Sequence, residues 1–175
     1  MDKDIIRKEI KELFLSNKHR FLDHKINEIL IGFLKDFNKI ALYEALSDEV
    51  SLSELKNAYL NKKELYLPKI NNDSLVFNLI KDDSSYEKNI YSINELKSNT
   101  NYSINDLNVV IVPLRAYDLK LNRVGRGKGF YDKTLNNSVI KVGVAYSFQE
   151  VNKINVLSND IKLDYLVNEK GVICI

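Results

Sequence analysis

Cysteine is almost absent from this 175-residue chain, and its one example, Cys174, is the second-last residue. A single thiol cannot form an internal disulfide, and it cannot supply a thiolate metal cluster. The composition therefore excludes a disulfide-stapled scaffold and a cysteine-based zinc site. Proteins without disulfides are typical of reducing compartments, so we expect a cytoplasmic location.

Long apolar runs are also missing. The most apolar windows, such as NVVIVP at 108–113, are only a few residues long, whereas a helix needs about 20 apolar residues to span a bilayer. The first residues, MDKDIIRKEIKELF, mix charges of both signs with apolar positions and lack the apolar core of a secretory signal. We expect neither a membrane span nor an export signal.

Neither sign of charge is in excess. Lys and Arg number 26 and Asp and Glu 24, which gives a formal net charge of +2. A protein with this balance is not a polyanion binder as a whole, so any anion site must be local. The hydrophobic fraction of 45% is enough for a folded core, and none of the two prolines and six glycines forms a linker. We expect a single domain over residues 1–175.

Helical and strand-like patterns alternate along the chain. The predicted helices cover residues 2–16, 24–37, 51–62 and 128–136, and the predicted strands cover 39–46, 64–68, 75–80, 90–93, 108–112, 140–146, 164–167 and 172–175. Pro68 and Pro113 follow strand-like runs, and we expect them to end those strands. The pattern predicts an α/β fold, a three-layer α-β-α domain with a mostly parallel, mixed sheet that is Rossmann-like.

The segment RVGRGKGFYD, residues 123–132, holds three of the six glycines and two of the five arginines. Its alternating glycines allow backbone amides to approach an anion closely, and its cations supply the matching charge. The segment leads from a buried strand into a helix, which is where α/β sheets place ligands. These features together favour a polyphosphate.

Two familiar phosphate motifs do not fit this segment. A P-loop requires Ser or Thr after its lysine, and Gly129 stands there; the dinucleotide fingerprint G-x-G-x-x-G is one residue longer than the G-x-G-x-G found here. The segment on its own could instead be a solvated basic turn or, less in keeping with the nearby aspartate, an RNA-binding loop. Asp132 close behind the cations favours a metal-bound nucleotide over a bare phosphate backbone.

Carboxylates near the segment suggest where a metal would lie. Asp132 is a candidate Mg²⁺ ligand, because Mg²⁺ takes one or two carboxylates together with phosphate oxygens and water. Asp160 and Asp164, in NDIKLDYLVNE, offer a second carboxylate. Each aspartate could instead cap a helix or lie on the surface. Asp118 either orients the basic loop or caps a turn.

The stretch VPLRAYDLKLNRVGRGKGFYD, residues 112–132, resembles the signature of the 5-formyltetrahydrofolate cyclo-ligase family: a strand ending in Val-Pro, an aromatic-Asp pair, and R-x-G-x-G-x-G-[FY]-Y-D. Weaker matches follow in the family's order on both sides. They are KDIIR, IALYEALSDEVSL, LYLPKI, IYSINEL and NDIKLDYLVNE. The resemblance covers nearly the whole chain. It departs from the family pattern at Leu96, Leu114 and Arg115.

The resemblance implies a set of site residues. Those assigned to ATP are Lys3, Arg7, Arg123, Gly125, Arg126, Gly127, Lys128, Gly129, Phe130 and Tyr131, and those assigned to folate are Glu44, Glu49, Glu95 and Tyr131. Arg126, Lys128 and Tyr131 are assigned catalytic roles, and Asp132 and Asp160 are assigned to the metal.

The activity that the resemblance implies is an ATP- and Mg²⁺-dependent cyclisation of 5-formyltetrahydrofolate to 5,10-methenyltetrahydrofolate, with release of ADP and phosphate. An enzyme of this kind is expected to be a monomer that binds its small-molecule substrates and neither nucleic acid nor membrane. Two rivals differ in their ligands. An RNA-binding module would show steep salt dependence without ATP, and a sugar-phosphate isomerase would bind one phosphate and need no nucleotide.

Overall fold

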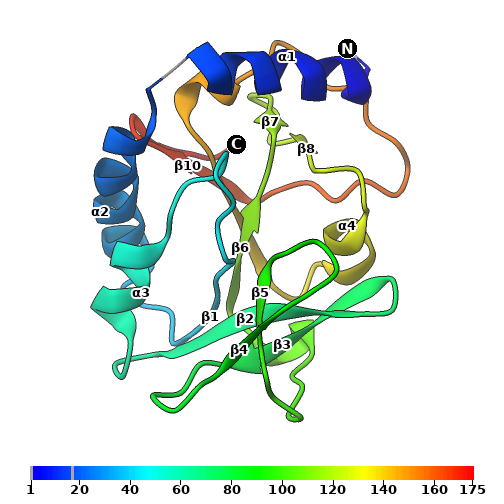
Figure 1. Ribbon diagram of the computed structural model, residues 1–175. Helices are drawn as coiled ribbons and strands as arrows, with labels where there is room; N and C mark the ends of the chain where they lie inside the picture. The colour runs from blue at the N-terminus through cyan, green and yellow to red at the C-terminus, as the bar shows by residue number, and fades with distance from the viewer. Residues whose placement is uncertain (1, 17) are drawn as a thin grey trace.

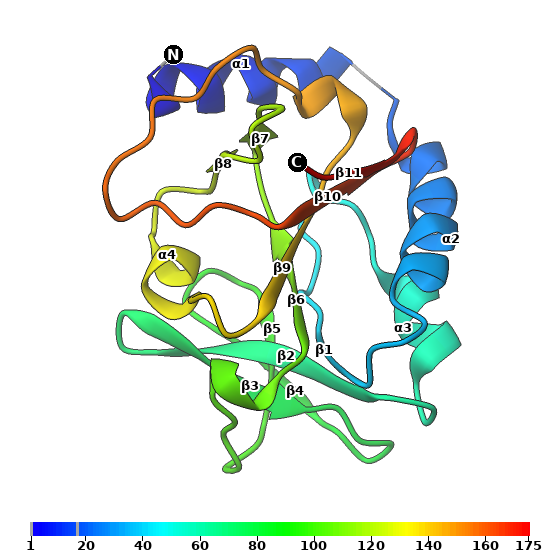
Figure 2. The same ribbon diagram turned by 180° about the vertical axis from the view of Figure 1, so that it is seen from behind.

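The computed structural model of the chain describes residues 2–16 and 18–175. Its centre is a seven-stranded sheet with the order β11-β10-β9-β6-β1-β2-β3 (Figures 1 and 2). The strands of this sheet are β1 Lys39–Ala41, β2 Glu64–Asn71, β3 Ser74–Leu79, β6 Val109–Pro113, β9 Ile140–Val144, β10 Tyr165–Asn168 and β11 Gly171–Ile173. The inner neighbours pair in parallel, and only β2–β3 and β10–β11 are antiparallel. The predicted mostly parallel, mixed sheet is confirmed.

Helices cover both faces of this sheet. They are α1 Lys3–Ser16, α2 Asp23–Phe33, α3 Ser53–Tyr59 and α4 Phe130–Thr134, with short 3₁₀ turns η1 Arg20–Leu22, η2 Ile104–Asp106 and η3 Ser147–Gln149. Alternate strand residues point to opposite faces. Ile40, Val109 and Ile111 pack with α1, α2 and α3, whereas Ala41 and Val110 belong to the cluster on the face of α4. The three-layer prediction therefore holds, and each face of the sheet has its own apolar core.

Two predictions about strand length are wrong. The strand predicted over 39–46 ends at Ala41, and Pro68 lies inside β2 instead of ending it. Pro68 is opposite Phe77, which exchanges both of its backbone hydrogen bonds with Tyr102 on its other side. The nitrogen of Pro68 therefore points toward β1, beyond the last pair between the two strands at Ala41 and Tyr66. A proline is tolerated at this position because no donor is needed there.

The polar middle of the chain forms a separate hairpin. Strands β4 Tyr86–Lys88 and β5 Asn94–Leu96 pair in antiparallel fashion outside the main sheet. The strand predicted at 90–93 is wrong, because these residues form the turn of the hairpin. Asn89 fixes this turn by accepting hydrogen bonds from the amides of Tyr91 and Ile93 at 2.9 and 3.1 Å.

A small hairpin delivers the glycine-rich segment to its place. Strands β7 Ala116–Tyr117 and β8 Arg123–Val124 pair around a turn whose centre is the buried side chain of Asp118. The carboxylate of Asp118 accepts hydrogen bonds from the amides of Lys120, Asn122 and Ile154 at 3.0–3.1 Å. Asp118 thus orders the turn that precedes the glycines.

Asp118→Asn is expected to lower the free energy of unfolding by about 1–2 kcal/mol. The side-chain NH₂ of asparagine would replace the oxygen that accepts from Ile154 and from the side chain of Asn122. Urea denaturation measures the loss. An unchanged midpoint would show that the turn does not depend on this carboxylate.

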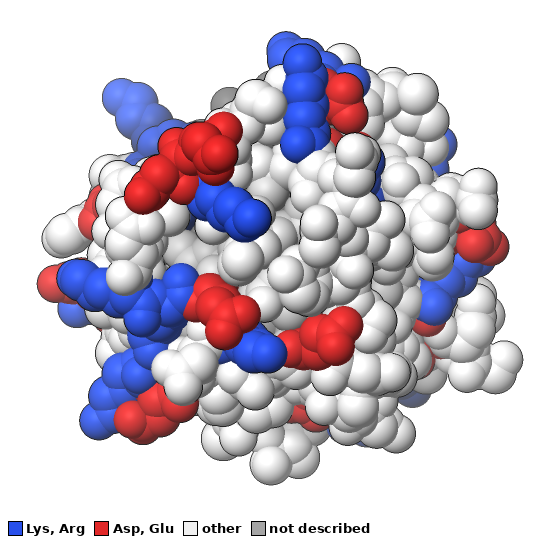
Figure 3. All heavy atoms as spheres, turned by 90° about the horizontal axis from the view of Figure 1, so that it is seen from below, with Lys and Arg blue, Asp and Glu red and all other residues white. Residues whose placement is uncertain are grey.

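Charges of both signs occur together on the face that Figure 3 shows. On the face seen from below in Figure 3, Lys and Arg lie beside Asp and Glu, and neither sign forms a continuous patch there. Among the described residues, no helix has the length and apolar character that crossing a membrane would require.

Candidate active site

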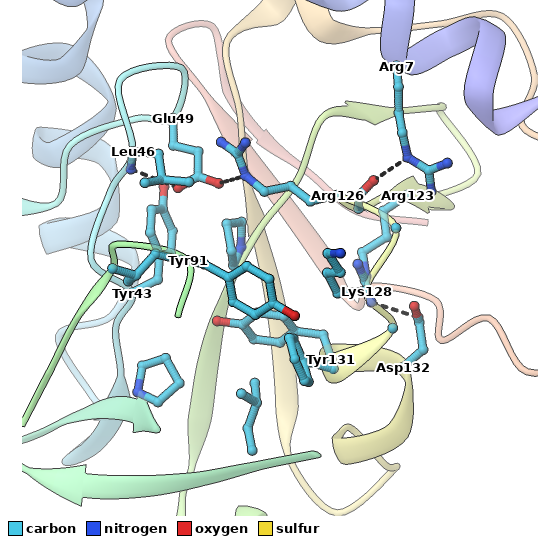
Figure 4. Close-up of a pocket in the computed structure, with 18 of the residues that line it drawn as sticks. Arg7, Tyr43, Leu46, Glu49, Tyr91, Arg123, Arg126, Lys128, Tyr131 and Asp132 are labelled. Atoms are coloured by element: carbon cyan, nitrogen blue, oxygen red, sulfur yellow. Dashed lines mark hydrogen bonds and ion pairs between the residues drawn. The ribbon is translucent and has the colours of Figure 1, made fainter. Parts of the chain in front are cut away.

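A pocket of about 710 Å³ opens at the carboxyl ends of β1 and β6. Tyr43 and Glu44 follow β1 and line one wall, Pro113 ends β6, and the whole glycine-rich loop lines another wall (Figure 4). The pocket therefore lies where an α/β sheet ordinarily places its ligand. All of the predicted site residues are among those that line it: Lys3, Arg7, Glu44, Glu49, Glu95, Arg123, Gly125, Arg126, Gly127, Lys128, Gly129, Phe130, Tyr131, Asp132 and Asp160.

The glycine-rich loop uses its glycines for conformation and for close approach. Gly127 and Gly129 have φ of +92° and +72°, a region that other residues rarely adopt. Gly129 directly precedes α4. The guanidinium of Arg7 on α1 donates from Nε to the carbonyl oxygen of Gly125 at 2.8 Å. The N-terminal helix is thus attached to the loop, and its arginine lies in the pocket.

Arg123 and Asp132 form an ion pair at the base of this loop. Nη2 of Arg123 lies 2.6 Å from Oδ1 of Asp132, and the arginine side chain is only 4% exposed. The same oxygen accepts from the amide of Ile161 at 3.3 Å. Nε of Arg123 is buried and has no hydrogen-bond partner within the part of the chain that the structure describes. A buried donor of this kind is normally satisfied by a ligand or water.

Lys3 and Asp160 join the two ends of the chain across the pocket. Nζ of Lys3 lies 2.5 Å from the carboxylate of Asp160. Burial works against ionisation of Asp160, but the amide of Leu157 and the ammonium of Lys3 outweigh it and lower the pKa of this carboxyl. Both carboxylates predicted to bind metal are therefore paired with a cation in this structure.

Arg126 reaches away from its own loop to the opposite wall. Its Nε donates to Oε1 of Glu49 at 2.8 Å, and its Nη2 donates to the carboxylate of Asp48 (Figure 4). The other oxygen of Glu49 accepts from the amide of Leu46 at 3.0 Å. Asp48 also accepts from Arg115. Burial opposes ionisation of Asp48, but the two arginines lower its pKa nonetheless.

The other two carboxylates predicted to bind folate, Glu44 and Glu95, have different surroundings. The buried carboxylate of Glu95 accepts from the amide of Ile70 and from Asn89 at 2.9 and 2.8 Å. Glu95 therefore also braces the hairpin. Glu44 lies 3.5 Å from Nζ of Lys56 and is about one-third exposed.

Aromatic side chains form the remaining wall. The ammonium of Lys128 lies over the ring of Tyr91 at 5.3 Å, and Tyr91 meets Phe130 edge-on at 6.0 Å. Burial raises the pKa of the Tyr131 hydroxyl, and the negative charge of Glu49 adds to this effect while Arg123 opposes it. Tyr131 is therefore a neutral phenol at physiological pH.

Sequence reasoning missed four residues that shape the pocket: Arg20, Tyr43, Asp48 and Tyr91. Arg20 donates to the carbonyl oxygens of Leu46, Ser47 and Glu49 at 2.8–3.2 Å and so fixes the loop that presents Glu49. The scarcity of arginine was the available signal, since all five arginines lie at the pocket or bind its walls.

The departures from the family pattern do not remove a pocket side chain. Leu96 and Leu114 are buried in the two apolar cores. Leu114 lies against Gly143, where even a Cβ atom would come within 2.9 Å of it. Arg115 pairs with Asp48 behind the pocket wall.

The fold and the pocket together define an α/β enzyme. In its site, a cationic, glycine-rich loop lies opposite a wall that carries carboxylates. The model of the 5-formyltetrahydrofolate cyclo-ligase family matches residues 3–169. The cyclo-ligase of Mycoplasma pneumoniae is 30% identical over 97% of this chain and 100% of its own length, and that of Haemophilus influenzae is 36% identical over 73% and 74%.

Solved structures agree with this result. The 5,10-methenyltetrahydrofolate synthetase of Aquifex aeolicus superposes with a TM-score of 0.88 at 31% identity and covers 98% of this chain and 92% of its own. The Mycoplasma pneumoniae synthetase gives 0.75 at 27% identity, with 97% and 99% covered. The chain belongs to the 5-formyltetrahydrofolate cyclo-ligase family, which confirms the family and the class of enzyme predicted from the sequence.

Proposed function

We propose that this enzyme converts 5-formyltetrahydrofolate to 5,10-methenyltetrahydrofolate at the expense of ATP, which yields ADP and phosphate. The observation that carries the proposal is the pairing of two walls in one pocket. The glycine-rich loop with Arg123, Arg126 and Lys128 suits a polyphosphate, and Glu49 on the facing wall suits the N–H donors of a pterin edge.

The chemistry explains why ATP is needed. A formamide oxygen is a poor leaving group, so N10 of the folate cannot displace it directly. Transfer of the γ-phosphoryl group to that oxygen gives an imidoyl phosphate. N10 then attacks the formyl carbon, loses its proton and forms the new C–N bond, while the C–O bond breaks and phosphate leaves. The protein contributes positioning and charge stabilisation.

The cations would do most of this work. Lys3, Arg7 and Arg123 enter the pocket from α1 and β8, and we assign them with Lys128 to the triphosphate. The unpartnered Nε of Arg123 supports this assignment, because an anion would satisfy it. The neutral phenol of Tyr131 can donate a hydrogen bond or provide a ring face to the folate.

Asp132 and Asp160 are proposed to hold Mg²⁺. Across the described stretches of the chain, no group of three or more His, Cys, Asp or Glu is placed to hold a metal alone. Two carboxylates in the pocket nevertheless fit Mg²⁺, which completes its shell with phosphate oxygens and water. The ion supplies charge neutralisation when it is bound with the nucleotide. We further propose a cytoplasmic monomer, in keeping with the lone cysteine and balanced charge.

The purified chain is expected to form the methenyl product only with both ATP and a divalent cation present. The near-ultraviolet absorbance of the product follows the reaction, and omission of ATP or addition of EDTA is the control. Equal turnover without ATP, or no turnover with it, would contradict the proposal. Thermal stabilisation by inorganic phosphate alone would favour the hypothesis of a sugar-phosphate isomerase. Salt-sensitive binding of RNA would favour the hypothesis of an RNA-binding module.

Glu49→Gln is expected to raise the KM for folate by about tenfold while changing that for ATP less. The substitution keeps an oxygen that can accept from the amide of Leu46 but removes the negative charge that attracts N–H donors. A charge-assisted hydrogen bond contributes about 1.5–3 kcal/mol. Steady-state kinetics with each substrate varied in turn measures the effect. A larger change for ATP would reverse our assignment of the two walls.

A further inference from the structure

The guanidinium of Arg126 lies against the carboxylate wall of the pocket, away from the loop that we assign to phosphate. It belongs to the glycine-rich loop, yet its guanidinium is held by Glu49 and Asp48 across the pocket. Glu49 is also the carboxylate that we assign to the pterin. The same contact therefore occupies a group needed by each of the two substrates.

The two carboxylates differ in what they keep when Arg126 leaves. Asp48 retains Arg115, which donates to its other oxygen. Asp48 would thus stay ion-paired, and departure of Arg126 would not leave it as a lone charge. Glu49 retains only the amide of Leu46 among the bonds described here, and its freed Oε1 would lie open to a new donor. Breaking the contact with Arg126 therefore costs little free energy at Asp48. At Glu49, a hydrogen bond from a ligand can replace the lost contact.

The two walls also differ in freedom to move. Arg126 stands between Gly125 and Gly127, and its side chain is about one-third exposed. The loop of Asp48 and Glu49 is fixed at three carbonyl groups by Arg20. Exchange of partners would therefore move the arginine and leave the carboxylates in place.

We propose that Arg126 is shared between the nucleotide and folate sites and couples them. Phosphates draw Arg126 off Glu49 and so prepare Glu49 for the pterin, while a pterin on Glu49 releases Arg126 to the phosphates. Asp48 and Arg115 act as positioning residues that set where Arg126 rests. This inference rests on the proposed function, because it describes how ATP and folate raise each other's affinity for the enzyme.

The test measures the Kd of 5-formyltetrahydrofolate with and without β,γ-methylene-ATP and MgCl₂. The native enzyme should bind folate at least about fivefold tighter with the nucleotide analogue, and folate should tighten the analogue by the same factor. Arg126→Met should bring both ratios to within about twofold of one, with folate binding no weaker than native when the analogue is absent.

Lys128→Met is the matched control, because Lys128 is on the same loop but lies over Tyr91. It should weaken the analogue yet keep the folate ratio once the analogue is saturating. Asp48→Asn should tighten the analogue by about two- to fivefold, since one competitor for Arg126 is removed; a structural role for Asp48 would weaken binding or leave it unchanged.

Independent binding in the native enzyme, or coupling that survives Arg126→Met, would overturn the inference. Native enzyme that converts folate with ATP but shows independent binding would leave the proposed function standing. Native enzyme that binds neither probe and shows no turnover would overturn both.

Discussion

Asp132→Asn is expected to lower turnover by about tenfold or more, and part of the rate should return as the Mg²⁺ concentration is raised. Asparagine keeps the shape of aspartate but removes the charge that a divalent cation needs. It also leaves the guanidinium of Arg123, which is 4% exposed, beside a neutral partner. We therefore expect a loss of about 1–2 kcal/mol in the free energy of unfolding as well.

Titration of turnover with Mg²⁺ and denaturation of the same variant separate these two effects. Asp73→Asn is the control. Asp73 pairs with Lys133, which lies in α4 next to Asp132, but the side chain of Asp73 is 73% exposed and lies outside the pocket. It should change neither property. A destabilised Asp132→Asn enzyme with native Mg²⁺ dependence would show that Asp132 serves only the scaffold.

Arg123→Met is expected to lower the free energy of unfolding by about 2–3 kcal/mol and to weaken ATP binding. Removing one member of a buried ion pair usually costs about 3–5 kcal/mol, and the loss is smaller here because Asp132 is 24% exposed and can be hydrated. Methionine fills similar volume, so little of the loss comes from a cavity.

The double variant Arg123→Met, Asp132→Leu tests whether stability and activity depend on the pair in different ways. An apolar pair should recover much of the stability lost in the single variant, since buried ion pairs are often replaceable. Activity should remain at least about a hundredfold below native, because both charges are gone. Recovery of activity with stability would mean that the pair has no direct role in catalysis.

Most of the fold followed from the sequence pattern, because short, mostly apolar runs rich in β-branched residues, such as VVIVP and IKVGV, are typical of buried strands. The two errors have different causes. Pro68 continues β2 because β1 stops short, which is a tertiary cause that local sequence does not reveal. Residues 90–93 turn because the side chain of Asn89 binds the amides of Tyr91 and Ile93, which is a local turn signal that the strand-like pattern of IYSI obscured.

The site was predictable to the extent that it is local or familiar. The glycine-rich segment, residues 123–132, supplies nine of the pocket residues, and the family resemblance brought in Lys3 and Glu49 from elsewhere. Arg20 and Asp48 could not be found in this way. Each acts through a partner distant in sequence, so only the folded chain reveals that one fixes the loop of Glu49 and the other holds Arg126.

The ion pair between Lys3 and Asp160 determines when, during synthesis of the chain, the pocket can be completed. The two residues are 157 positions apart, and at about 5–20 residues per second a ribosome needs roughly 8–30 s to make the chain between them. Gly125, whose carbonyl oxygen binds Arg7, is made 118 residues after Arg7, and until Asp160 follows, Lys3 has no carboxylate to pair with. A growing chain can hold most of the sheet and still have an open, unfinished pocket. Activity should therefore begin only after the segment around Asp160 has been made and has closed onto the first helix.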